Sequence, residues 1–308
     1  MFKKLVKTLL VASFAITSGL TAYAGGHAQK ITEFRVGILG GENQADRLRR
    51  TKCFVDKAEA LLGVPTKVFA PADYNGVIEG LIGGNLDMAW LGASGYAKVY
   101  LADPNIVEPV LSLVGKDGNF GYYALGFARK DSGIENLADM KGKQFAFGDP
   151  NSTSGYLIPS IEIPDLGYSM EPGEHFSDVV FSGGHEQTIV GVYNGDYDAG
   201  VSWSGGTGDW EDGYDYGAFR LASDSGLVDM TEMVEIWRSK IIPEGPIVLR
   251  TTLPEKVKIQ ITALLAGLSS MDPECAYSFG AGEIKGMISV SHEDYESIVA
   301  ARKAKIGG

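Results

Sequence analysis

Short apolar runs typical of β-strands alternate with amphipathic stretches along the first part of the chain. The run 33–39 ends at two glycines, and apolar residues then recur at helical spacing in the segment 48–62. A second strand is predicted at 66–69, a helical face at 75–84 and a third strand at 86–91. This alternation predicts an α/β fold with a parallel or mixed sheet covered by helices.

A similar alternation resumes after a glycine-containing break at residues 116–121. Two such units in one chain predict two lobes with a cleft between them. Ligands of open α/β sheets bind outside the carboxyl ends of the strands, where helices begin, so binding chemistry is expected at the helix starts. The strands and helices expected in this later part are 123–128, 144–147, 179–181, 185–193, 198–203, 247–250, 254–268 and 273–279.

The first residues have the pattern of a secretory signal. Lys3, Lys4 and Lys7 precede an apolar run at 9–20, and a small-residue motif ends at Ala24, where cleavage is expected. No cysteine stands at this point, which favours a freely soluble exported protein over a lipid-anchored one. Beyond the signal, no apolar run reaches the roughly 18 residues that a membrane-spanning helix needs.

The charge and the cysteines narrow the classes of partner and chemistry. The formal net charge is −12, which argues against nucleic acid and anionic membranes as partners. Export would place Cys53 and Cys275 in an oxidising compartment, where they could form one disulfide or remain two separate buried thiols. Neither has a nearby histidine, so a catalytic cysteine is not expected.

The strongest local motif runs from Phe147 to Tyr156. A predicted strand enters a Gly-Asp-Pro-Asn turn, and Ser152, Thr153 and Ser154 then occupy the first turn of a helix, where backbone N–H groups lack internal partners. These amides, the helix dipole and up to three hydroxyls can replace the hydration of a tetrahedral oxyanion without a full positive charge. The alternative is that Ser152 is only a helix N-cap.

Four segments resemble the PhnD-type phosphate/phosphite/phosphonate-binding family of periplasmic proteins. They are GDPNSTSGYLIPS (148–160), ADYNGVIEGLIGGNLDMAWLG (72–92), SGGHEQTIVGVYNGDYDAG (182–200) and IIPEGPIVLR (241–250), and the resemblance keeps the family's order across most of residues 33–252.

The resemblance implies a two-lobed type II periplasmic binding protein fold with a hinge and an inter-lobe ligand cleft. The expected parts are a signal peptide at 1–24, lobe 1 at 25–124 with a return segment at 247–308, and lobe 2 at 125–246. By the same resemblance, the protein is a monomeric periplasmic receptor that needs no cofactor or metal. It would close around a small phosphorus oxyanion and deliver it to the ABC permease subunits of the inner membrane.

The resemblance also implies which side chains hold the ligand. Taken alone, the His could be a surface or capping residue and each Tyr could be ordinary core packing. The expected ligand-binding residues are Tyr74, Tyr122, Ser152, Thr153, Ser154 and His185.

Two departures from the family concern the ligand. Members that take 2-aminoethylphosphonate place carboxylates around its ammonium group, whereas Gly205 and Gly245 stand at those positions here. Burying an ammonium group without a paired carboxylate is costly, which favours a short alkylphosphonate, phosphite or phosphate. Glu244 and Asp209 are close enough in sequence to substitute for the missing carboxylates.

Aromatic residues near these positions have two interpretations. Either Trp203 or Trp210, which flank a glycine-rich stretch, lines the pocket and sorts ligands by size, or both pack within a lobe. Trp90 is expected to pack rather than to face the ligand.

Two other functions remain as alternatives to a transport receptor. An exported phosphatase or other hydrolase would use a serine of 152–154, but it needs a base and an oxyanion site, and no G-x-S-x-G or H-E-x-x-H motif occurs. The four histidines are too scattered to predict a metal centre. An accessory protein that reports ligand to a membrane sensor would bind in the same way.

Overall fold

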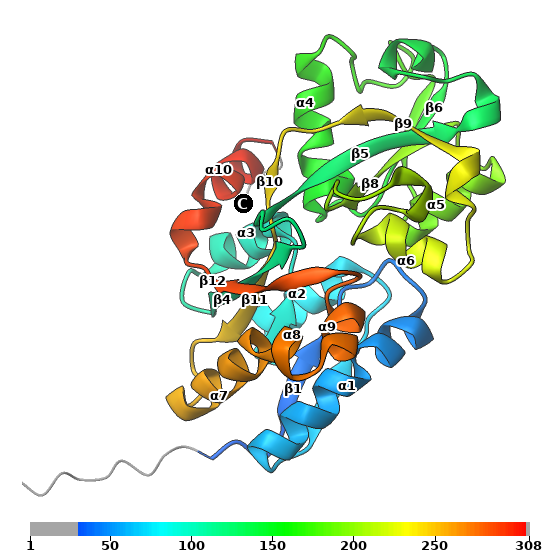
Figure 1. Ribbon diagram of the computed structural model, residues 1–308. Helices are drawn as coiled ribbons and strands as arrows, with labels where there is room; N and C mark the ends of the chain where they lie inside the picture. The colour runs from blue at the N-terminus through cyan, green and yellow to red at the C-terminus, as the bar shows by residue number, and fades with distance from the viewer. Residues whose placement is uncertain (1–29, 306–308) are drawn as a thin grey trace, which may run out of the picture. The chain divides into compact units, whose positions relative to one another are not determined.

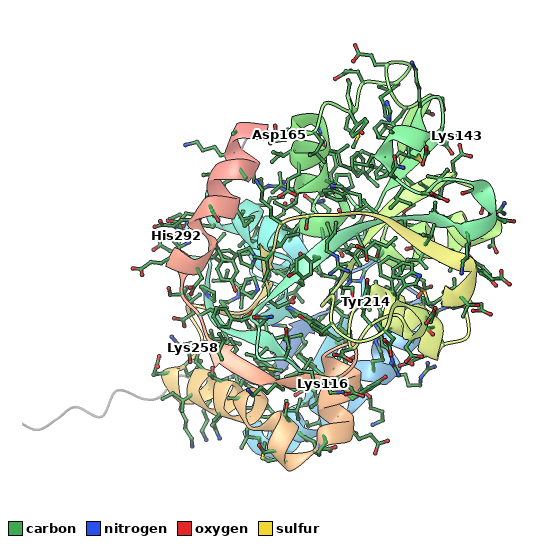
Figure 2. All side chains as sticks on the ribbon, turned by 45° about the horizontal axis from the view of Figure 1, so that its top comes forward. Lys116, Lys143, Asp165, Tyr214, Lys258 and His292 are labelled. Carbon is green, nitrogen blue, oxygen red and sulfur yellow. A yellow bond between two sulfur atoms is a disulfide. The ribbon has the colours of Figure 1, made fainter. Side chains whose placement is uncertain are left out.

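The computed structural model describes residues 30–305 (Figure 1). The predicted signal peptide at 1–24 lies outside the described residues. Within the described range, no helix combines the length and the apolar character that crossing a membrane requires. This range forms two six-stranded sheets, each with helices against it. Figure 2 shows the side chains of the described residues on these sheets and helices.

The first sheet takes strands from the early part of the chain and from its return. Its strands are β1 (Phe34–Gly37), β2 (Thr66–Phe69), β3 (Met88–Trp90), β4 (Val107–Gly115), β11 (Pro246–Arg250) and β12 (Ile284–Ser289). Their order is β12-β4-β11-β3-β1-β2, with β1 parallel to both β2 and β3, and β11 antiparallel to β3 and β4. The helices of this unit are α1 (Gln44–Leu62), α2 (Tyr74–Ile82), α3 (Ala93–Ala102), α7 (Glu255–Ala266), α8 (Leu268–Met271), α9 (Pro273–Phe279) and α10 (Glu296–Lys305).

Both faces of the first sheet are buried. Successive residues of β11 alternate between two cores: Ile247 and Leu249 pack with residues of α1 and α7, whereas Val248 packs with residues of α2, α3 and α10. A strand covered on both faces is apolar throughout, which explains the continuous apolar run in the sequence. The helices therefore cover both sides of the sheet.

The second sheet contains the middle of the chain. Its strands are β5 (Gly121–Arg129), β6 (Gln144–Phe147), β7 (Asp178–Phe181), β8 (Ala199–Ser204), β9 (Met233–Arg238) and β10 (Ile242–Pro243). The order is β10-β5-β8-β6-β7, and β9 also pairs with β5. Its α-helices are α4 (Pro159–Asp165), α5 (His185–Asn194) and α6 (Ala218–Asp224).

The α/β class with two sheet units is confirmed, but four strands were not predicted from the sequence pattern: β4, β9, β10 and β12. All four pair with strands that are far away in the chain. The helix expected near Ser152 begins as a π-helical turn, η3 (Thr153–Leu157), before α4. Pro159 has no N–H to donate, and the preceding amides of Leu157 and Ile158 bond to the carbonyls of Ser152 and Thr153, five residues back.

One disulfide joins Cys53 of α1 to Cys275 of α9. The two cysteines are 222 residues apart in the sequence, so the bond ties the start of the first unit to its return segment. Of the two possibilities left open by the sequence, the structure has the disulfide.

Candidate functional site

A cavity lies where the ends of strands from both sheets meet. The first unit contributes residues that follow β1 and β3, and the second contributes residues 152–154, which follow β6, and His185, which begins α5. Helices begin at these strand ends, so unpaired amides and side chains converge on one place. This is the arrangement expected from the two series of strands and helices.

All six residues predicted to hold a ligand line this cavity. None has more than 6% of its surface exposed. Tyr74 is the first residue of α2, Tyr122 lies on β5, and His185 is the first residue of α5. The hydroxyl residues 152–154 form the start of η3. The fold therefore places the six residues predicted from the sequence around one cavity, while their contact with a ligand stays a prediction.

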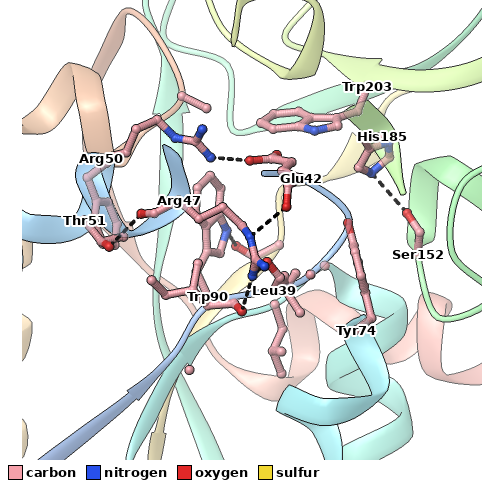
Figure 3. Close-up of a pocket in the computed structure, with 18 of the residues that line it drawn as sticks. Leu39, Glu42, Arg47, Arg50, Thr51, Tyr74, Trp90, Ser152, His185 and Trp203 are labelled. Atoms are coloured by element: carbon pink, nitrogen blue, oxygen red, sulfur yellow. Dashed lines mark hydrogen bonds and ion pairs between the residues drawn. The ribbon is translucent and has the colours of Figure 1, made fainter. Parts of the chain in front are cut away.

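His185 is a neutral donor or acceptor rather than a charged one. Its Nε2 lies 3.2 Å from Ser152 Oγ and its Nδ1 lies 3.1 Å from Ser202 Oγ (Figure 3). Burial lowers the pKa of His185 to about 3, so the ring is uncharged at pH 7. His185 can therefore contribute hydrogen bonds to the cavity but not a positive charge at pH 7.

Ser152 both caps the η3 turn and faces the cavity. Its Oγ accepts a hydrogen bond from the amide of Gly155 at 2.9 Å. When His185 carries its proton on Nε2, Ser152 accepts from that nitrogen as well, and its own proton is free to donate into the cavity. The N-cap role and the binding role are therefore compatible.

Thr153 connects the two units. Its Oγ1 accepts a hydrogen bond of 2.8 Å from the amide of Ser94, near the start of α3. Because Oγ1 already accepts from an amide of the first unit, the proton of this hydroxyl remains available to donate. Thr153 is 1% exposed, so it lies fully within the contact between the units.

Tyr74 and Tyr122 provide two further hydroxyl donors. Burial is the main cause that raises the pKa of both phenols well above the ordinary value, so both keep their protons at pH 7. The Tyr74 ring is at 6.4 Å from the His185 ring, with the two set at a steep angle (Figure 3). Hydrogen bonding from Ser152 partly offsets the rise in the pKa of Tyr74, and hydrogen bonding from Thr153 and Ser154 does the same for Tyr122. The tyrosines thus face the hydroxyl residues of η3.

The positions of Gly205 and Gly245 have no room for a side chain. A Cβ built on Gly205 would lie 1.9 Å from a ring carbon of Tyr216, and one on Gly245 would lie 2.1 Å from the carbonyl oxygen of Leu91. Both distances are far below van der Waals contact. Neither position could carry a carboxylate without a shift of the surrounding structure.

Of the two acidic residues that could substitute, only Glu244 lines the cavity. Its side chain is 4% exposed, and burial raises the pKa of its carboxyl to about 8. Asp209 instead precedes the short helical turn at Trp210–Asp212 and is not among the lining residues. The sequence could not separate these two carboxylates because neither lies in a recognisable motif.

Two tryptophans from different sheets form an aromatic wall of the cavity. Trp203 and Trp90 both line it, with ring centroids 6.3 Å apart and nearly perpendicular planes. Trp90 also stacks on Phe279 at 6.0 Å. Trp90 packs as expected, and because β3 ends at the cavity its side chain also lines it, while the expectation that it does not contact a ligand stays a prediction. Trp210 packs against Phe219 and is not a lining residue.

Two arginines of α1 also line the cavity, but both already bond to other groups of the protein. The guanidinium of Arg47 donates to the carbonyls of Leu39 at 2.7 Å and Pro71 at 3.0 Å, and Arg50 forms an ion pair with Glu42 (Figure 3). Burial lowers the pKa of Arg47. These contacts fix the segment after β1, and sequence motifs gave no sign of them.

The site does not favour hydrolysis. A serine nucleophile needs an effective base, and a histidine whose pKa is lowered to about 3 is a weak one. The second ring nitrogen of His185 faces the hydroxyl of Ser202, where a catalytic triad would have a carboxylate. Among residues 30–305, no three His, Cys, Asp or Glu side chains are grouped so as to hold a metal.

Comparisons with known proteins agree with this geometry. A family model described as "ABC transporter, phosphonate, periplasmic substrate-binding protein" matches residues 36–295. The phosphonates-binding periplasmic protein of Escherichia coli (strain K12) is 30% identical over 264 residues, which cover 82% of this chain and 72% of that protein. The phosphate-import protein PhnD of Mycolicibacterium smegmatis is 25% identical over 290 residues, which cover 89% and 85%.

A solved structure has the same fold. PhnD1 from Prochlorococcus marinus (MIT 9301), determined in complex with methylphosphonate, matches with a TM-score of 0.73 at 20% identity. The match covers 90% of this chain and 99% of that one. The two-lobed α/β fold predicted from the sequence is thereby confirmed.

Proposed function

The chain belongs to the family of periplasmic substrate-binding proteins of phosphonate ABC transporters, and from this we propose that its cavity binds a phosphonate or a related phosphorus oxyanion. Proteins of this family are substrate-binding components of transporters and not enzymes. The protein would deliver its ligand to the permease subunits of an ABC importer.

The observation that carries this proposal is the convergence of uncharged donors from both units in one buried cavity. Hydroxyls of Ser152, Thr153 and Ser154, the unpaired amides at the start of η3, and the imidazole of His185 would bind the oxyanion from the second unit. Tyr74 would bind it from the first unit, and Tyr122 from the strand that follows the crossing between the sheets.

A ligand that touches both units would favour the closed state, since it interacts more strongly with that state than with an open one. The chain passes between the sheets after β4 and again before β11. These two crossings support a hinge, with lobe 1 at 25–124 and 247–308 and lobe 2 at 125–246. We also propose that the protein acts as a monomer in the periplasm after loss of residues 1–24.

The cavity favours a ligand without an amine. The two positions that would carry an amine cradle are glycines packed against neighbouring atoms. Phosphate, phosphite and methylphosphonate are therefore better candidates than 2-aminoethylphosphonate, because a buried ammonium group needs a paired carboxylate.

Calorimetric titration of the protein with these four compounds tests the function. We expect at least one of the three amine-free oxyanions to bind, and 2-aminoethylphosphonate to bind more weakly than it. The mixtures with methylphosphonate and 2-aminoethylphosphonate, incubated and assayed for released phosphate, should show no turnover. Absence of binding by all four would overturn the proposed function, and steady turnover would favour the hydrolase.

A further inference from the structure

Glu244 places a buried carboxyl group in a cavity built for an anion. It lies between β10 and β11, lines the cavity, and is 4% exposed. Its Oε1 accepts from the amide of Gly245 at 3.2 Å, and its Oε2 is 3.4 Å from the hydroxyl of Tyr216. Both contacts are long for a carboxylate. In the described part of the chain, no cation is among the groups that shift the pKa of Glu244.

The backbone of Glu244 does not depend on its side chain. Its carbonyl oxygen accepts from the hydroxyls of Ser112 at 3.1 Å and Tyr295 at 3.0 Å. An apolar side chain of similar size would keep these bonds and would avoid the free energy of burying a carboxyl group. The carboxyl therefore has no evident structural task.

An ionised Glu244 would conflict with the proposed function. A carboxylate without a cation, buried beside a bound oxyanion, would repel the ligand in a medium that screens charge poorly. A protonated carboxyl has the opposite effect, because its O–H becomes one more donor facing the anion. Burial in the cavity favours the proton, since it raises the pKa of Glu244 to about 8.

The titratable groups around Glu244 keep their protonation state near neutral pH. Tyr122 of β5, Tyr216 before α6 and Tyr295 before α10 all have a pKa raised above the ordinary value, chiefly by burial. His185 stays neutral because burial lowers its pKa to about 3. Glu244 is therefore the member of this group that changes charge near pH 8.

The remaining neighbours of this segment add no cation. From β3, Trp90 donates its indole N–H to the carbonyl of Gly245 at 3.1 Å, and from β4 the Ser112 hydroxyl bonds to the carbonyl of Glu244. Asp117, another carboxylate, helps to raise the pKa of Tyr216. The charged groups Glu42, Arg47 and Arg50 line the same cavity but are not among the groups that shift the pKa of Glu244. Burial thus favours the neutral form of Glu244 and outweighs the two long hydrogen bonds from Gly245 and Tyr216, which favour the charged form.

We propose that Glu244 is a specificity-determining residue that donates a hydrogen bond from its protonated carboxyl to an oxygen of the bound phosphorus oxyanion. The site then prefers a ligand that presents an acceptor oxygen towards Glu244 over one that presents an ammonium group. This inference rests on the proposed function and names how the same cavity distinguishes its ligands.

The proposal fixes the sign of a pH dependence. When binding requires the proton on Glu244, this residue causes no pH dependence of the affinity as long as the pH lies below the pKa of Glu244 in the unliganded protein. Above that pKa, each binding event must take up one proton, so the dissociation constant rises by about tenfold per pH unit. The ligand titrates as well, so the effect must be measured against a variant that cannot ionise at position 244.

Glu244→Gln supplies that comparison, since glutamine keeps the shape and one N–H donor. Dissociation constants for methylphosphonate and phosphate are measured by calorimetry for both proteins between pH 6 and 9.5. We expect the two proteins to agree within about threefold at pH 6 to 7, and the ratio of wild-type to variant constants to climb towards tenfold per pH unit above pH 8. Glu293→Gln, the same change at an exposed site, should leave the ratio flat.

Three outcomes would overturn the inference. A ratio that stays flat with pH would mean that Glu244 does not share a proton with the ligand. A wild-type protein that gains affinity over the variant as pH rises, above all for 2-aminoethylphosphonate, would mean that Glu244 acts as a carboxylate towards a cationic substituent. Failure of the wild type to bind any of these compounds at pH 6 would instead remove the proposed function, and this inference with it.

Discussion

At the scale of single residues, the site relies on donors that carry no formal charge. Ser152, Thr153 and Ser154 each place a hydroxyl at the start of η3, and His185 is neutral because it is buried. In such a site each oxygen of a bound oxyanion would depend on individual hydrogen bonds, because the two lining arginines are already bonded to Leu39, Pro71 and Glu42. Single hydroxyl deletions should therefore be visible in the affinity.

Removing one hydroxyl of η3 should weaken binding. We expect Ser154→Ala to reduce the binding free energy by about 1–3 kcal/mol, since a buried anionic oxygen loses a donor. Thr153→Ala should lose at least as much, because it also breaks the bond from the Ser94 amide. Ser160→Ala removes a buried hydroxyl that bonds to the Leu157 carbonyl and is not among the lining residues, so it should leave affinity unchanged. Calorimetry on all three decides the point, and wild-type affinity in both Ser154→Ala and Thr153→Ala would exclude these hydroxyls from the site.

The residues found from the sequence and those missed differ in how local their signal is. The hydroxyls of 152–154 lie in one short motif at a strand–helix junction, so their direction follows from local geometry. The sequence did not show whether Glu244 or Asp209 would reach the cavity, because their burial depends on how β10 and β11 pair with distant strands. For Trp90 the sequence indicated packing, which the structure has, but not its place at the cavity, because the other wall of that cavity comes from the second unit.

At the scale of elements, two glycine-containing turns allow the units to approach each other closely. A Cβ on Gly184 would lie 2.2 Å from the Cα of Gly41, and the amide of Glu186 approaches the carbonyl oxygen of Gly41 at 3.4 Å. Gly184 has an extended backbone with φ 171°, which any residue can adopt. A side chain at this position would therefore act through contact with the other unit and not through backbone strain.

Gly184→Ala should hinder closure while the fold remains intact. We expect affinity for the ligand to fall by about 1–3 kcal/mol, the usual range for an overpacked contact. Small-angle scattering should show that saturating ligand compacts the variant less than the wild type. Gly95→Ala serves as the control, because the nearest atom to its added Cβ is 3.7 Å away. Equal affinity and equal compaction in Gly184→Ala would show that this contact does not limit closure.

The alternation of strands and helices was predictable because each element buries its own apolar face. What the sequence could not give is the order of strands within the sheets. β12 adds to β4 across more than 160 residues, and β9 adds to β5 across about 100. Such pairings depend on the whole chain rather than on any window of it.

At the scale of the whole molecule, the disulfide fixes the return of the chain to the first unit. Cys53 and Cys275 sit on α1 and α9, and the aromatic rings of Phe54 and Phe279 meet beside them at 5.3 Å. The pairing could not be deduced from the sequence, because it requires that helices from opposite ends of the chain lie against each other. A covalent link over so long a loop mainly limits the unfolded chain.

Replacing both cysteines by serine should lower stability more than it changes binding. We expect the free energy of unfolding to fall by about 2–5 kcal/mol, as for removal of a native disulfide. Affinity for the ligand should stay within about threefold, since neither cysteine lines the cavity. Urea denaturation with and without ligand measures both quantities. An unchanged unfolding midpoint would contradict the stabilising role of the bond.

The hydrogen bond from the Ser94 amide to Thr153 makes one hydroxyl common to both units. Any motion that draws α3 away from η3 must replace that amide with water, and the incoming water would also reach the side of Thr153 that is proposed to face the anion. Hydration would then compete with the protein for the ligand at the moment the units part. Hydration of this one hydrogen bond would couple opening of the two units to release of the ligand, and no residue would have to change its charge.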